Sequence, residues 1–247
     1  MLIIGLTGGI STGKSTISNH LRKKGIPIVD ADLIARQIME PGARGYNLVL
    51  KNFGKDVLLQ NSNQIDRKKL GEIIFRNVEK RQLLNRCTHP AVRTKMLSEL
   101  LGYYIRGYPM CVLDVPLLFE GGLHRYCNKV VVVSSTEQIQ LERLMKRDGI
   151  TEEQAMSRIE AQMPLSEKRK LADMIIENNG TIENTINQVD TIINKIKPSK
   201  FKVIGALLAP LGICTSIFGM FIPGKFSLAL GGFLGSTTLF LLSISNL

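Results

Sequence analysis

Short apolar runs alternate with helix-spaced amphipathic segments over residues 1–202 of the chain. The strand-like runs cover residues 2–6, 26–29, 110–114, 129–133 and 174–177. Runs of this kind are typical of parallel strands, because both faces of a parallel sheet are covered by helices. The alternation predicts an α/β fold with a five-stranded parallel sheet flanked by helices.

Directly after the first predicted strand, residues 8–15 fit the phosphate-binding pattern G-x-x-x-x-G-K-[ST]. A helix-spaced segment follows, so backbone N–H groups and a helix N-terminus converge on one anion site. Lys14 is expected to reach the β- and γ-phosphates, and the Ser15 hydroxyl to bind Mg²⁺. The predicted nucleotide-binding residues are Gly8, Gly9, Ile10, Ser11, Thr12, Gly13, Lys14, Ser15 and Thr16.

Acidic residues follow two of the predicted strands. Asp30 and Asp32 come after the second strand, and Asp114 ends the third. Ligands of open α/β sheets bind beyond the carboxyl ends of the strands. Asp30 is as well explained by an N-cap as by chemistry, whereas Asp32 lies too deep in the next helix to be only a cap. Asp114 has the position of a carboxylate beside Mg²⁺, with a turn residue before Pro116 as the alternative.

Residues 41–107 contain no strand pattern and predict a helical insertion that binds the phosphoryl acceptor. Helices are expected over 67–75, capped by Asp66, over 78–86, and from Pro90 to about residue 105. His89 precedes the third of these helices; a lone histidine is more often a hydrogen-bonding group there than a catalyst.

Arginines gather on the helices predicted after the fourth strand, over residues 137–165. Arg143 and Arg147 share a helical face, and Arg158 lies on a following helix opened by Thr151 with Gln154 in capping-box register. Arginine offers forked donors to phosphate oxygens. The group therefore predicts a lid over the phosphates, although each arginine alone fits a solvated basic face.

Charge is distributed unevenly along the chain. The formal net charge is +11, which suits polyphosphate ligands, but there is no dense basic block with interleaved aromatic residues, so nucleic acid is not expected as a partner. The four cysteines form no C-x-x-C pair, which favours reduced thiols in a cytosol-facing protein.

After Lys202 the only charged side chain is Lys225, and two uncharged stretches result, each long enough for the roughly 20 residues of a membrane span. We expect residues 203–247 to attach the chain to a membrane as one span or a helical hairpin; the alternative is a hairpin buried in the soluble core. Four lysines just before it favour a cytosolic catalytic domain 1–202, with the endoplasmic reticulum and the mitochondrial outer membrane as candidate sites.

These features together describe a small-molecule kinase with the P-loop kinase fold. The chain has no N-K-x-D motif and no D-x-x-G after the third strand, which counts against a switch GTPase. A kinase of this class places an acceptor hydroxyl in line with the γ-phosphoryl group of ATP.

The sequence also resembles the dephospho-CoA kinase family. The resemblance covers residues 1 to about 197, and the matching pieces occur in the family's order: residues 5–15, Asp30-Ala31-Asp32, Glu40-Pro41-Gly42, Thr88-His89-Pro90, residues 115–120, Arg143 with Arg147, Ala161-Gln162, Asp173 and Asn178-Asn179-Gly180. Two features depart from it, namely Ser11-Thr12 in the loop and the uncharged tail, which occurs in some eukaryotic relatives.

The resemblance implies phosphorylation of the ribose 3′-hydroxyl of dephospho-CoA by ATP with Mg²⁺, the last step of coenzyme A synthesis. It implies that Asp32 is the general base, that Lys14 and the loop amides hold ATP, and that Arg147 with Arg143 clamps the phosphates. It also implies an acceptor side lined by His89, Leu117, Leu118, Phe119 and Glu120. The alternatives are a kinase for another nucleotide or nucleoside and an idle nucleotide-binding scaffold at a membrane.

Overall fold

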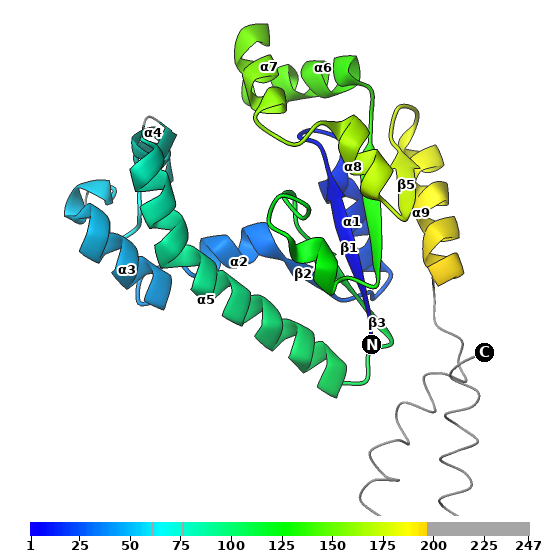
Figure 1. Ribbon diagram of the computed structural model, residues 1–247, viewed down its shortest axis with the longest axis horizontal. Helices are drawn as coiled ribbons and strands as arrows, with labels where there is room; N and C mark the ends of the chain where they lie inside the picture. The colour runs from blue at the N-terminus through cyan, green and yellow to red at the C-terminus, as the bar shows by residue number, and fades with distance from the viewer. Residues whose placement is uncertain (61, 76, 197–247) are drawn as a thin grey trace, which may run out of the picture. The chain divides into compact units, whose positions relative to one another are not determined.

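The computed structural model describes residues 1–60, 62–75 and 77–196. A parallel sheet runs through this part of the chain in the order β2-β3-β1-β4-β5 (Figure 1). Its strands are β1 (Leu2–Gly8), β2 (Ile28–Asp30), β3 (Met110–Asp114), β4 (Lys129–Ser134) and β5 (Met174–Glu177). The predicted five-stranded parallel sheet is confirmed, and the predicted bounds of β3 and β5 match the structure.

The register of the sheet places its functional residues on one edge. Leu6 of β1 lies opposite Asp114 of β3, and Asp30 of β2 lies opposite the same Asp114. The phosphate loop begins two residues beyond Leu6. The loop and both acidic strand ends therefore share the carboxyl edge of the sheet.

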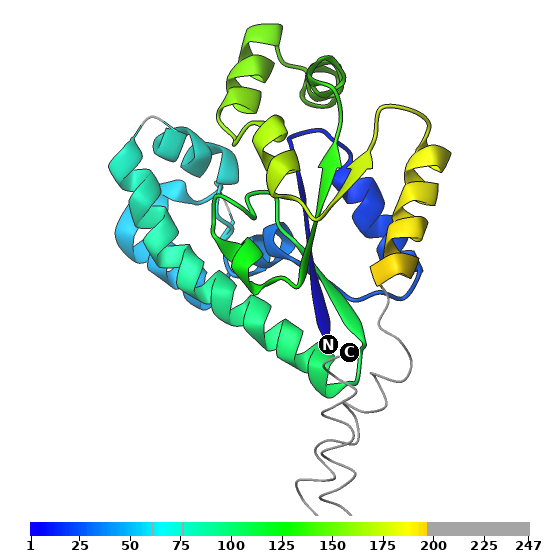
Figure 2. The ribbon, with the colours of Figure 1, turned by 45° about the vertical axis from the view of Figure 1, so that its right-hand side comes forward.

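Helices cover both faces of the sheet. On one face, α1 (Lys14–Lys23) and α9 (Ile182–Ile196) pack on alternate side chains of the central strands, such as Ile4 and Leu6. On the other face the core joins Cys111 and Val132 to Leu118, to Met96 of α5 (Val78–Ile105) and to Leu165 of α8 (Leu165–Leu171) (Figure 2). Successive side chains of each strand thus point alternately into one apolar layer and into the other.

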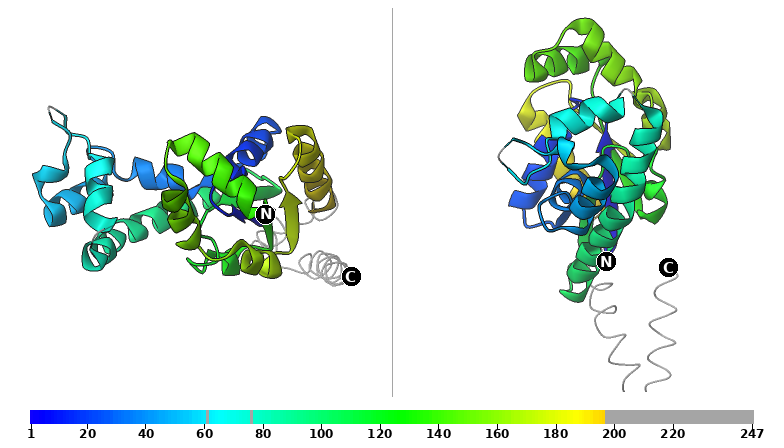
Figure 3. Two further views of the ribbon diagram at one scale, coloured as in Figure 1. Left: turned by 90° about the horizontal axis from the view of Figure 1, so that it is seen from above. Right: turned by 90° about the vertical axis from the view of Figure 1, so that its left-hand side faces the viewer.

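The helical insertion has an apolar core of its own. It contains α3 (Arg44–Phe53), the 3-10 turn η1 (Lys55–Val57), α4 (Arg67–Phe75) and the first half of α5, and it projects to one side of the sheet (Figure 3). The members of this second core are buried in the structure: Tyr46, Val49, Val57, Ile65 and Leu70. As predicted, Asp66 caps α4, accepting hydrogen bonds from the amides of Lys68 and Lys69 at 3.0 Å each.

Helix α5 is one continuous helix, so the prediction of separate helices over 78–86 and from Pro90 was wrong. Proline inside a helix removes one hydrogen bond and costs about 3 kcal/mol. Packing on both sides of Pro90 outweighs this cost, because Leu84 packs on the core of the insertion and Met96 is buried in the main core.

The remaining described elements connect the strands. Helix α2 (Ala31–Gln37) follows β2, a 3-10 turn η2 (Leu123–Tyr126) precedes β4, and α6 (Glu137–Asp148) and α7 (Glu152–Glu160) form the arginine-bearing pair, with the predicted capping box at Thr151 present. Helix α8 was not predicted. The predicted apolar segment 203–247 lies outside the described residues; within those residues, no helix combines the length and apolar content needed to cross a bilayer.

Candidate active site

The phosphate loop is held by side chains from the far end of the sheet and from the lid. The Asn178 amide donates to the Thr12 carbonyl at 2.8 Å. Gln162 accepts from the Ile10 amide, and Gln140 donates to the Ile10 carbonyl, both at 3.0 Å. These contacts fix the loop before any ligand arrives, which lowers the cost of ordering it around a phosphate.

Two glycines of the loop are required by this packing. Gly13 has φ +90°, and a Cβ there would lie 2.2 Å from the Asn178 amide nitrogen. A Cβ on Gly9 would lie 2.2 Å from the Gln140 amide nitrogen. Glycine at these positions therefore serves a close approach and, at Gly13, a left-handed backbone.

The loop also presents groups that have no protein partner. The Ser11 hydroxyl is buried and forms no hydrogen bond with any residue that the structure describes. Ser15 and Thr16 lie exposed on the first turn of α1. The Thr16 amide donates to the Gly13 carbonyl at 3.1 Å, whereas Ser15 lies where helix N–H groups lack intrahelical partners. A phosphate group is the kind of ligand that satisfies such donors.

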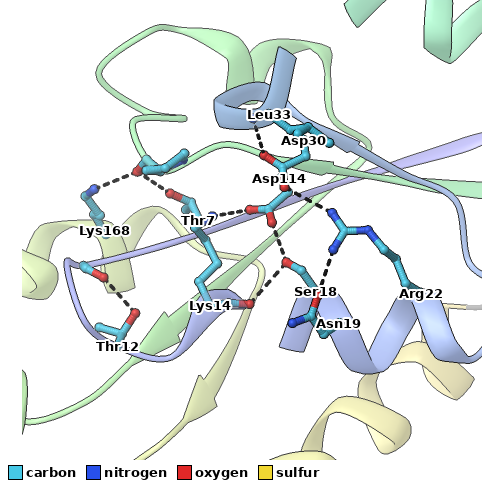
Figure 4. Close-up of polar contacts among 12 residues, drawn as sticks. Thr7, Thr12, Lys14, Ser18, Asn19, Arg22, Asp30, Leu33, Asp114 and Lys168 are labelled. Carbon is cyan, nitrogen blue, oxygen red and sulfur yellow. Dashed lines mark hydrogen bonds and ion pairs between the residues drawn. The ribbon is translucent and has the colours of Figure 1, made fainter. Parts of the chain in front are cut away.

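Lys14 contacts the carboxylate of Asp114, as Figure 4 shows. The same carboxylate accepts a hydrogen bond from the Ser18 hydroxyl, and Asp114 is only 2% exposed. The buried negative charge of Asp114 is thus balanced by Lys14. Ser18 was not predicted from the sequence; it lies one turn beyond Lys14 on α1, the only local signal that could have found it.

Asp30 is occupied as a helix cap. One carboxylate oxygen accepts from the Leu33 amide at 3.0 Å, and the other accepts from Arg22 at 3.1 Å (Figure 4). Asp32 differs, because its carboxylate forms no hydrogen bond or ion pair with another described residue. The two acids of the Asp30-Ala31-Asp32 sequence therefore differ in their surroundings: Asp30 has hydrogen-bond partners and Asp32 has none among the described residues.

The electrostatic surroundings of Asp32 make it a stronger base than a free aspartate. Partial burial raises the pKa of Asp32, and the neighbouring charges of Asp30 and Asp114 raise it further against the opposing effect of Lys14. A raised pKa increases the affinity of a carboxylate for a proton.

The lid arginines are held in two ways. Arg147 forms a two-point ion pair with Asp148, at 2.7 and 3.2 Å, and Arg158 contacts the same carboxylate at 2.6 Å. On Arg143, the Nη1 atom is buried without a hydrogen-bond acceptor among the described residues. Arg143 is thus an unsatisfied donor, whereas the Nε and Nη2 atoms of Arg147 are engaged by Asp148.

The predicted acceptor side contains residues in very different positions. Leu118 and Phe119 are buried in the main core, Leu117 is 48% exposed, and His89 lies exposed within α5. Glu120 binds Lys168 at 2.9 Å, a lysine of α8 that is completely buried. Roles of these residues in acceptor binding stay predictions.

Lys168 was missed by sequence reasoning. Its neighbours Arg169 and Lys170 give the local sequence the look of an exposed basic run, so no local signal marks Lys168 as buried. Its ammonium group donates to the Pro116 carbonyl at 3.3 Å, and Thr7 donates to the same oxygen at 2.8 Å. Lys168 therefore connects α8 to the loop after β3.

The donor chemistry of this edge fits Mg²⁺. In the described ranges, no cluster of three or more His, Cys, Asp or Glu side chains could hold a metal by itself. Kinases hold Mg²⁺ with one or two protein oxygens and the phosphates of the substrate. The Ser15 hydroxyl and the Asp114 carboxylate are oxygen donors of the required kind.

Comparisons with known proteins identify the family that the chain resembles. A family model described as dephospho-CoA kinase matches residues 2–184. The chain is 46% identical to a dephospho-CoA kinase domain-containing protein of Danio rerio over 224 residues, covering 90% of this chain and 96% of the relative. It is 50% identical to a dephospho-CoA kinase of Oceanobacillus iheyensis over 194 residues, covering 78% and 97%.

A solved structure is also similar. The dephospho-CoA kinase from Campylobacter jejuni superposes with a TM-score of 0.61 at 31% identity, covering 79% of this chain and 96% of that chain. Since the family model spans most of the sequence and the relatives align over nearly their whole lengths, this chain belongs to the dephospho-CoA kinase family.

Proposed function

We propose that this kinase transfers the γ-phosphoryl group of ATP to the ribose 3′-hydroxyl of dephospho-CoA, with Asp32 as the general base. One observation carries the assignment of the base. Of the three acids at the carboxyl ends of β2 and β3, Asp30 is a cap and Asp114 is neutralised by Lys14, whereas Asp32 forms no hydrogen bond or ion pair with another described residue.

In the proposed reaction, the 3′-oxygen of the acceptor attacks the γ-phosphorus as its proton passes to the Asp32 carboxylate. The bond from the γ-phosphorus to the bridging oxygen breaks, and ADP leaves. The raised pKa of Asp32 suits this role, because a general base is most effective when its pKa approaches the working pH. Lys14 and the loop amides bind the charged phosphate oxygens.

The lid and the metal contribute charge. Arg143 offers a buried donor that lacks an acceptor within the described residues, and a phosphate oxygen would satisfy it. Arg147 would exchange the Asp148 carboxylate for phosphate, since both accept the two-point contact of a guanidinium. Mg²⁺, held by Ser15 and Asp114, would supply positive charge to the phosphates.

The test is the Asp32→Asn variant, which keeps the shape of the side chain and removes its basicity. We expect kcat for ADP release with dephospho-CoA to fall by about 10²–10⁴, with the dissociation constant for ATP unchanged. At neutral pH, Asp30→Asn is the matched control, because asparagine caps helices as well as aspartate does. A kcat near that of the parent enzyme in Asp32→Asn would remove the proton-acceptor role. Faster turnover of a nucleoside monophosphate than of dephospho-CoA would instead contradict the substrate.

We also propose that residues 203–247 attach the enzyme to a membrane with its catalytic domain in the cytosol. Support comes from the sequence, in which Lys225 alone carries a side-chain charge after Lys202 and a run of lysines precedes the segment. Flotation of the full chain with phospholipid vesicles tests this attachment. Recovery of the protein only in the bottom fraction would contradict it.

A further inference from the structure

Helix α5 carries a second apolar face that no described residue covers. Leu97, Leu101, Tyr104 and Ile105 are 67%, 53%, 58% and 74% exposed. Their spacing of four, three and one residues places them on a single stripe of a helix with 3.6 residues per turn. We call these four residues the α5 stripe.

A different face of α5 contributes to the main core. Val92, Met96, Leu100 and Tyr103 pack against the main core. That face accounts for the stability of the helix, so the α5 stripe is additional. Four large exposed apolar side chains in one row form the kind of surface that marks a binding site.

The α5 stripe lies at the end of the catalytic domain that is farthest from the lid. Helix α5 ends just before β3 starts, and parallel strands start at the edge opposite the phosphate loop. Helices α1 and α9 also end at this edge, as Figures 1 and 2 both show. A surface bound here would leave the carboxyl edge open to substrates.

Basic side chains stand at the helix ends of this edge. Lys23, Arg106 and Lys195 stand at the ends of α1, α5 and α9, are exposed, and form no ion pair within the described part of the chain. Helix C-termini favour cations in any protein, so these charges alone identify no partner. Together with aliphatic side chains and a tyrosine, they form the composition that lies at the boundary between lipid headgroups and acyl chains.

We propose that the α5 stripe docks on the surface of an anionic lipid bilayer. The inference rests on the proposed membrane attachment of residues 203–247. Only six residues separate Ile196, where α9 ends, from that segment, and six residues span at most about 20 Å. The short connection keeps this edge of the catalytic domain near the bilayer, and the exposed stripe and its cations then face the lipid.

The absence of tryptophan from the chain permits a direct test. The Tyr104→Trp variant of the full chain introduces one fluorophore on the stripe. Val78→Trp is the matched control, because Val78 and Tyr104 are both 58% exposed and lie on the same helix, about 40 Å apart at 1.5 Å per residue. Each variant is reconstituted in phosphatidylcholine–phosphatidylserine vesicles with either brominated or unmodified acyl chains. An unchanged rate of ADP release shows that the variants are folded.

We expect brominated lipid to quench the fluorescence of Tyr104→Trp at least twofold more than that of Val78→Trp. Adding Ile105→Glu to Tyr104→Trp should reduce this quenching. Co-flotation with equal quenching of both variants would overturn docking of the stripe while leaving membrane attachment intact. The same conclusion follows if Tyr104→Trp emits at short wavelength but is not quenched, since the stripe is then covered by protein. Failure of the full chain to float would overturn attachment and docking together, and neither result bears on the kinase reaction.

Discussion

Replacing Lys168 by methionine should destabilise the fold, because Lys168 is a completely buried cation whose partners remain behind. Its ammonium group lies 2.9 Å from the Glu120 carboxylate and 3.3 Å from the Pro116 carbonyl oxygen. Methionine fills nearly the same volume, so Lys168→Met removes the charge and the hydrogen bonds without opening a large cavity.

The expected loss of stability depends on how exposed Glu120, the partner of Lys168, is to solvent. Breaking a fully buried ion pair by removing one member costs about 3–5 kcal/mol. The Glu120 side chain is 26% exposed, so its carboxylate regains some hydration. It also keeps the hydrogen bond from the Met163 amide at 3.2 Å. We therefore expect a loss of about 2 kcal/mol in the free energy of unfolding, below the range for a fully buried pair. For a domain of this size that lowers Tm by about 4–8 °C.

The pH dependence of the loss identifies its cause. Burial acts to raise the pKa of Glu120, but hydrogen bonds from Lys168 and from the Met163 amide outweigh it and hold the pKa below 4.5, the ordinary value. A carboxylate with a lowered pKa stabilises the fold above its unfolded pKa, and this contribution is lost as the pH falls through the folded pKa. The Tm difference between parent and Lys168→Met should therefore be largest near neutral pH and shrink below about pH 4.5.

Thermal unfolding followed by circular dichroism measures both effects. Lys170→Met is the matched control, because Lys170 lies in the same helix, is exposed and forms no ion pair among the described residues; its Tm should stay within about 1–2 °C, as for most surface changes. If Lys168→Met unfolds at the same temperature as Lys170→Met, the buried pair does not stabilise this fold. If the decrease in Tm does not vary with pH, its cause is altered packing and not the loss of the ion pair.

Three further changes probe the active site. Asp30→Asn keeps the cap but removes a negative charge that raises the pKa of Asp32. The acidic limb of the kcat–pH profile should therefore move to lower pH, and an acidic limb at the same pH would contradict this coupling. Gly13→Ala forces a side chain into φ +90°, which costs about 1–2 kcal/mol, and calorimetry should show ATP binding at least fivefold weaker. Asp148→Asn releases Arg147 from an exposed pair worth about 0.2–1 kcal/mol; the KM for ATP should fall by up to about fivefold, and a rise would mean that Asp148 positions the arginine.

The strands and the phosphate loop could be predicted because their signals are local. A buried parallel strand reads as an uninterrupted apolar run, and β3 and β5 have turn-forming residues beside them, such as Pro109 before β3 and Asn178-Asn179-Gly180 after β5. The phosphate loop could be recognised from its motif alone, because the path from β1 to Gly13 and Lys14 requires particular backbone angles. The order of the strands in the sheet depends on which strands pair with one another, and a single sequence does not give that pairing.

Helix α5 shows where local rules failed. Proline is favoured in the first turn of a helix and penalised inside one, so a boundary at Pro90 is the locally preferred choice. The observed helix runs through Pro90 because its two halves are buried in two different cores. That information lies in residues far from Pro90 in the sequence, and helix propensity is a weak guide against it.

The active-site acids show the same limit at the scale of single side chains. The sequence places Asp30, Asp32 and Asp114 at one edge, but their chemical states depend on partners that differ in distance along the chain. Asp30 is satisfied by Leu33, three residues away, so its role as a cap could be anticipated; the partner of Asp114 is Lys14, one hundred residues away. Asp32 is assigned as the base only after both neighbours are accounted for, because a carboxylate that already accepts strong hydrogen bonds or pairs with a lysine has a weaker claim on the substrate's proton.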